Sequence, residues 1–127
     1  MFYVDTCVYL NLFRKEVSPS GRLLWKDAQD FFQRAGNRIV YSELVEREFT
    51  QKTGMLFIRW GRKVSMLPED LAFAEGILAD FGHRIGSKDC IHIALAKKCG
   101  AILVTRDRAL LECASRYVVA LLPENAL

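Results

Sequence analysis

The sequence lacks any apolar run approaching the roughly 20 residues that a membrane-spanning helix needs. It also lacks a basic leader with a small-residue cleavage site, because residues 1–4 already have the pattern of a strand. These absences predict a cytoplasmic protein that does not act in a membrane.

Cysteine is scarce, and charge of one sign is not in great excess. The four cysteines are scattered and form no C-x-x-C pair, so neither a zinc motif nor a disulfide framework is predicted. The net charge of +3 permits a polyanionic partner without requiring one. It is far below the basic excess of a dedicated nucleic-acid-binding arm.

What is present indicates one globular α/β domain spanning residues 1–127. Half of the residues are hydrophobic, and this length suffices for a domain that folds alone. Short apolar runs alternate with helical patterns, which predicts a parallel sheet with helices on both faces, a three-layer α/β/α arrangement. The expected strands are 1–4, 38–41, 64–67, 101–105 and 118–122.

The most informative stretch is 86–107, which reads GSKDCIHIALAKKCGAILVTRD. Ser87 is expected to cap a helix whose first turn holds Asp89, and Gly100 to follow the end of that helix. The continuous apolar run after Gly100 predicts a buried strand, which ends at Thr105-Arg106-Asp107.

Three aspartates therefore occupy related positions: Asp5 after the first strand, Asp89 at a helix start and Asp107 after the fourth strand. Ligands of open α/β sheets bind at the carboxyl ends of the strands. Gathered carboxylates repel one another unless a cation is bound, and oxygen ligands favour Mg²⁺ or Mn²⁺ over zinc. Each aspartate alone also has an ordinary explanation as a helix cap, a dipole partner or a turn residue.

The segments YVDTCVYL, IVYSELVEREF and SKDCIHIALAKKCGAILVTRD, in this order, resemble PIN-domain nucleases, and the compact size resembles the toxins of VapBC-type toxin–antitoxin pairs. The resemblance covers essentially the whole chain. It implies a five-stranded parallel sheet in the order 3-2-1-4-5, with four acidic residues at its carboxyl edge. It further implies cleavage of single-stranded or structured RNA by water activated by Mg²⁺ or Mn²⁺, an antitoxin as partner, and a homodimer.

Carried over by position, the resemblance makes Asp5, Asp89 and Asp107 catalytic metal ligands. The fourth acid is expected to be Glu48, and Glu46 and Glu43 remain alternatives on the same helix. Thr6 and Thr105 are expected to support the carboxylates. Three basic residues near this edge, Arg84, Lys88 and Arg106, are candidates for contacts with substrate phosphates, with ordinary surface charge as the alternative.

Two other features bear on the interpretation. His92 lies one turn beyond Asp89 in an apolar helix and is expected to be a packed, hydrogen-bonded histidine rather than a general base. Cys7 stands where relatives often have Asn or Ser, which favours the alternative of a catalytically silent PIN-like module that acts through a protein or RNA partner. A phosphoacceptor receiver domain fits less well, because the last expected strand is not followed by a lysine.

Overall fold

The structure is a computed structural model that describes residues 1–57 and 60–127. Within these residues, five strands form one sheet in which every neighbouring pair is parallel. The strands are β1 (Phe2–Val4), β2 (Ile39–Ser42), β3 (Arg62–Val64), β4 (Ile102–Val104) and β5 (Ala120–Leu121). Their order across the sheet is β3-β2-β1-β4-β5, which confirms the predicted topology.

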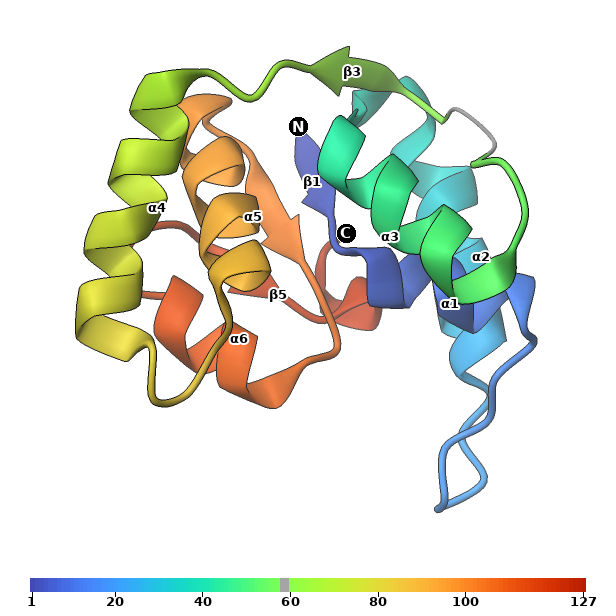
Figure 1. The fold of residues 1–127 in the computed structure, drawn as a ribbon. Coiled ribbons are helices and arrows are strands. Elements are labelled where there is room, and N and C mark those ends of the chain that lie inside the picture. Colours follow the sequence, from blue (N-terminus) through green and yellow to red (C-terminus); the bar gives the residue numbers. More distant parts are fainter. Residues whose placement is uncertain (58–59) are drawn as a thin grey trace.

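Six α-helices and two short 3-10 helices connect the strands. They are α1 (Thr6–Phe13), α2 (Leu24–Ala35), η1 (Gly36–Arg38), α3 (Glu43–Thr53), α4 (Pro68–Phe81), α5 (Ser87–Lys98), α6 (Arg108–Ala114) and η2 (Pro123–Asn125). Figure 1 shows α1, α2 and α3 on one side of the sheet and α4, α5 and α6 on the other. The predicted three-layer α/β/α architecture is therefore confirmed.

Burial explains why the central elements are so apolar. All three residues of β1 are buried, and β1 lies between β2 and β4. Helix α5 packs against β1 and β4 on one side and against α4 on the other. Six of its residues are buried as a result: Cys90, His92, Ile93, Ala94, Leu95 and Ala96. A helix covered on two sides needs no polar face in its middle turns.

Two local predictions are wrong. The third strand is Arg62–Val64 rather than 64–67, because this edge strand is largely exposed and its own sequence is basic rather than apolar. The N-cap of α5 is Gly86 in an extended conformation, and Ser87 is the first helical residue. Asp89 nevertheless lies in the first turn of α5, and Gly100 has the positive φ of +62° that suits a glycine after a helix end.

The parallel sheet brings the carboxyl ends of its strands to one edge. Asp5 directly follows β1, Ser42 ends β2, and Thr105 directly follows β4. Because β1 is hydrogen-bonded to both β2 and β4, these three positions are neighbours in space although they are far apart in sequence. The fold therefore assembles a polar site at this edge.

Candidate metal centre

Asp5 is held by two side chains, that of Thr105 directly after β4 and that of Cys7 in the first turn of α1. The hydroxyl of Thr105 donates to Oδ2 of Asp5 at 2.8 Å, and the thiol of Cys7 donates to the same oxygen at 3.2 Å. Asp5 is in the N-cap position of α1, but its side chain makes no capping hydrogen bond. The ordinary explanation of Asp5 as a helix cap therefore fails. The buried carboxylate is instead fixed with Oδ1 directed toward His92 at 3.8 Å.

Glu48, on α3, brings its carboxylate close to Asp5 and His92. Its Oε1 accepts hydrogen bonds from the hydroxyl of Thr6 at 2.9 Å and from Nε2 of His92 at 2.7 Å. Burial alone would raise the pKa of Glu48, but the hydrogen bonds from His92 and Thr6 lower it below its ordinary value. Glu48 is consequently an ionised carboxylate beside Asp5 at neutral pH.

The other two glutamates of α3 have partners elsewhere. Glu43 forms an ion pair with Arg47 at 2.6 Å, and Glu46 forms one with Lys63 at 2.6 Å. Neither contacts His92 or Asp5 in the described part of the chain. The arrangement therefore favours Glu48 as the fourth acid over the two alternatives that the sequence left open.

His92 is completely buried and contacts groups on both sides of its ring. Its Nδ1 lies 2.7 Å from the hydroxyl of Tyr3, and that hydroxyl lies 2.7 Å from Oγ of Ser42. This confirms a packed, hydrogen-bonded histidine. The sequence did not indicate that the ring would join β1, β2 and α3 at the acidic site.

Asp89 carries the clearest electrostatic sign of crowded carboxylates. Burial, and after it the charges of Asp5, Asp107 and Glu48, raise the pKa of Asp89 to about 6, while the charge of His92 opposes them. Across residues 1–57 and 60–127, no lysine or arginine forms an ion pair with any of these four carboxylates.

Asp107 has a mixed role. Its Oδ1 accepts a hydrogen bond from the backbone N–H of Leu110 at 3.1 Å, so it caps α6, a role that the sequence did not predict for it. Its backbone N–H donates to the hydroxyl of Thr105 at 3.1 Å, which links it to the group that fixes Asp5. Asp107 is exposed at the rim of the site, and its negative charge helps to raise the pKa of Asp89.

The metal-free protein is expected to become more stable as the pH falls from about 8 to about 5, with most of the gain from Asp89 coming below its folded pKa of about 6. The pKa of Asp89 is raised in the folded state, so folding favours its protonated form and stability increases as it takes up a proton. Burial would lower the pKa of His92, but Glu48, Asp5 and Asp89 raise it, so His92 contributes in the same direction. Thermal unfolding in EDTA checks this. Asp89→Asn should flatten the profile and raise the melting temperature at pH 8, and a steady loss of stability from pH 8 to pH 5 would contradict it.

The donor set suits a divalent cation. One ligand atom each from Asp5, Glu48 and His92 lie within 4.8 Å of one another, close enough for one ion to contact all three. Asp89 and Asp107 are outside this group of three. Their charges add to an excess of negative charge that a cation would relieve.

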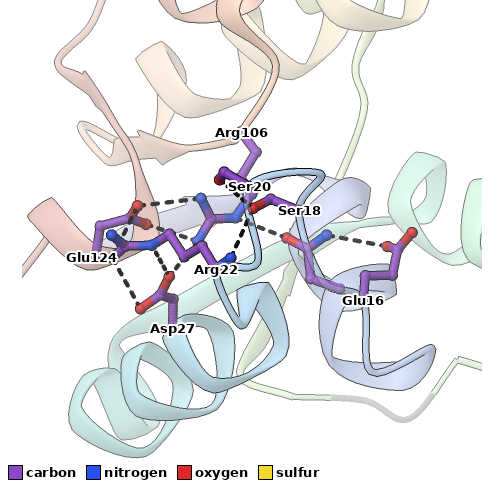
Figure 2. A network of polar contacts seen from close by, with 8 residues as sticks. Glu16, Ser18, Ser20, Arg22, Asp27, Arg106 and Glu124 are labelled. Carbon is purple, nitrogen blue, oxygen red and sulfur yellow. Dashed lines mark hydrogen bonds and ion pairs between the residues drawn. The ribbon is translucent and has the colours of Figure 1, made fainter.

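The guanidinium of Arg106 lies within a network of polar side chains that includes Asp27 and Glu124 (Figure 2). Its guanidinium donates to Glu124 through Nη1 at 3.2 Å and Nη2 at 2.8 Å. It also donates to Asp27 at 3.1 Å and, through Nε, to Asn11 at 3.1 Å. The predicted phosphate contact of Arg106 is therefore corrected, because protein acceptors on α1, α2 and η2 take four of the five N–H groups of its guanidinium.

The other two basic candidates differ from each other. Arg84 forms an ion pair with Glu112 of α6, so this carboxylate partly neutralises its charge. Lys88 is exposed in the first turn of α5, next to Asp89. Of the three predicted phosphate contacts, Lys88 is the one whose position best fits that role.

These elements define a three-layer α/β/α domain with an acidic centre at the carboxyl edge of its parallel sheet. A scan against protein-family models gave no match, and a search of curated proteins also gave none. Among solved structures, a chain of the FitAB complex bound to an IR36 DNA fragment matches with a TM-score of 0.71 and 16% identity, covering 98% of this chain and 96% of that one.

Two further solved structures agree with this comparison. FitAcB from Neisseria gonorrhoeae matches with a TM-score of 0.67 and 15% identity, covering 98% of this chain and 99% of that one. A toxin–antitoxin complex from Klebsiella pneumoniae matches with a TM-score of 0.62 and 16% identity, covering 87% and 90%. At such identities the likeness shows the fold, and the predicted PIN-like fold is confirmed. No helix in the described residues has the length and hydropathy to cross a membrane.

Proposed function

We propose that this protein is a metal-dependent endoribonuclease that hydrolyses phosphodiester bonds of single-stranded or structured RNA. The observation that carries the proposal is the gathering of Asp5, Glu48, Asp89 and Asp107 at one sheet edge without an ion-pairing lysine or arginine among the described residues. Crowded carboxylates cost stability, and a divalent cation makes them tolerable.

The chain's own residues would prepare the site for Mg²⁺ or Mn²⁺. Thr105 and Cys7 hold the carboxylate of Asp5, and Thr6 and His92 hold that of Glu48, so two ligand groups are fixed in advance. A bound divalent ion supplies neutralisation of the charge that develops on the phosphate and activation of the attacking water. Lys88, exposed beside Asp89, would contact a flanking phosphate of the RNA.

The decisive experiment compares two glutamates on the same helix. Purified protein would be incubated with mixed RNAs in the presence of Mg²⁺ or Mn²⁺, with an EDTA control. Glu48→Gln is expected to lower the cleavage rate by at least about a hundredfold, because it removes a charged ligand. Glu46→Gln should leave the rate within about twofold, because Glu46 pairs with Lys63 at the surface.

The same assay separates this proposal from its alternative. Equal activity of both variants would reject Glu48 as a ligand, and cleavage that persists in EDTA would reject a metal-dependent reaction. A catalytically silent module would show no cleavage in any arm. It would also show no rise in melting temperature when Mn²⁺ is added, since a ligand stabilises only the state that binds it.

We further propose that the protein is the toxin of a toxin–antitoxin pair, with an antitoxin protein as its partner. The support is the fold shared with the structures named above. A second support is an apolar groove lined by residues of α1 and α3 together with Phe57 and Trp60. Its lining is aromatic and aliphatic: Tyr9, Leu12, Phe13, Phe49, Phe57 and Trp60. A homodimer remains an additional proposal, to be checked by light scattering.

A further inference from the structure

We propose that His92 is itself a metal ligand, so that the site binds its first ion through one nitrogen and two carboxylate oxygens and prefers Mn²⁺ to Mg²⁺. The inference rests on the metal site of the proposed function and goes beyond its four acids. The three donors would be His92 from α5, Asp5 from the end of β1 and Glu48 from α3.

The imidazole of His92 lies close to the carboxylates of both Glu48 and Asp5. Nε2 of His92 lies 2.7 Å from Oε1 of Glu48 and 3.8 Å from Oδ1 of Asp5. All three ligand atoms thus converge on one small volume, from three different elements of the fold. Asp89 and Asp107 reach the rim of the site but are outside this group.

The other ring nitrogen of His92, Nδ1, faces the hydroxyl of Tyr3. Histidines that bind metals commonly donate the remaining N–H to an acceptor that fixes the tautomer and the ring orientation. Nδ1 of His92 lies 2.7 Å from the hydroxyl oxygen of Tyr3, which can accept that proton and donate its own to Oγ of Ser42 at 2.7 Å. When an ion displaces the proton that Nε2 donates to Glu48, this buried chain can therefore hold the tautomer in which the remaining proton is on Nδ1 and Nε2 offers its electron pair to the ion.

The types of ligand atom at a site determine which metal ion it prefers. A site built only from carboxylates suits Mg²⁺, which prefers oxygen ligands and gains little from an imidazole. An imidazole nitrogen adds more affinity for a first-row transition ion than for Mg²⁺. His92 therefore sets ion preference at the site.

The chain offers a sharp test, because it contains only two histidines. His83 is exposed in the loop between α4 and α5 and serves as the matched control. The protein would be labelled with ¹⁵N-histidine and loaded with Mn²⁺, and electron spin echo modulation would report nitrogen bound directly to the ion. We expect this coupling in the wild type and in His83→Gln, and its loss in His92→Gln.

Affinity measurements then separate ligation from simple positioning of Glu48. His92→Gln can still donate a hydrogen bond to Glu48, so it is expected to weaken Mn²⁺ binding about a hundredfold and Mg²⁺ binding less than about threefold. Tyr3→Phe keeps the imidazole but removes its acceptor. It should weaken Mn²⁺ binding about tenfold and retain the nitrogen coupling.

The outcomes are distinguishable from those of the nuclease assay. Mn²⁺-loaded wild type without nitrogen coupling would overturn the inference, even if the protein cleaves RNA with the metal. Equal weakening of Mn²⁺ and Mg²⁺ by His92→Gln would also overturn it, because His92 would then act only by holding Glu48. Nitrogen coupling in a protein that cleaves no RNA would support the ligand role and count against the proposed function.

Discussion

Asp5→Asn is expected to lower metal-dependent cleavage of RNA by about a thousandfold, the largest loss of activity from any single substitution. The carboxylate faces both Glu48 and His92, and an amide has neither the charge nor the affinity for a divalent ion. Loss of about 4 kcal/mol of charge stabilisation in the transition state corresponds to that factor. Cleavage rates at saturating Mn²⁺, measured on RNA, would provide the test.

The same substitution should not unfold the protein. An asparagine oxygen can still accept the hydrogen bond of Thr105, and one of the repelling charges near Asp89 disappears. We therefore expect the melting temperature of metal-free Asp5→Asn at pH 8 to equal or exceed that of the wild type. Asp30→Asn, on the exposed side of α2, is the matched control and should change neither property. Wild-type cleavage by a folded Asp5→Asn protein would reject this position as a ligand.

Local patterns were sufficient to place the two aspartates that follow strands at the carboxyl edge of the sheet. Asp5 and Asp107 each follow an apolar run, and a parallel sheet brings such positions together whatever lies between them in sequence. Asp89 was placed correctly by the helix-start pattern, although the cap is Gly86. The pattern failed for β3, because an exposed edge strand needs no apolar residues to identify it.

Choices that depend on partners from distant segments could not be made from one sequence. Glu43, Glu46 and Glu48 share one short helix, and only the contacts of Thr6 and His92 distinguish Glu48. The alternation of strand side chains could have shown that Tyr3 shares a face with Asp5, yet it could not show the contact with α5.

Arg106 is the most instructive error. Its position between Thr105 and Asp107 suggested a substrate contact, but its acceptors come from α1, α2 and η2. Its backbone N–H also donates to Sγ of Cys7 at 3.5 Å, within the group that fixes Asp5. The residue thus anchors the loop that carries Asp107 to the opposite layer of the fold.

Arg106→Met is accordingly expected to cause the largest loss of stability, about 3 kcal/mol, or roughly 10 °C in melting temperature. The side chains of Arg106, Asp27 and Glu124 are 14%, 19% and 19% exposed. Removal of the arginine therefore leaves Glu124, a poorly hydrated carboxylate, without its main partner, and leaves Asp27 with Arg22 alone. Thermal and urea unfolding of the purified variant would measure the loss.

Arg22 provides the matched control within the same cluster. It also pairs with Asp27 and Glu124, at 2.6 and 3.5 Å, but its side chain is 52% exposed. Arg22→Met should therefore lower the melting temperature much less than Arg106→Met does. Adding Asp27→Asn and Glu124→Gln to Arg106→Met should restore part of the lost stability, because these substitutions remove the carboxylate charges that Arg106 had neutralised. Equal losses from the two arginine substitutions, or no recovery in the triple variant, would show that burial of charge is not what makes Arg106 important.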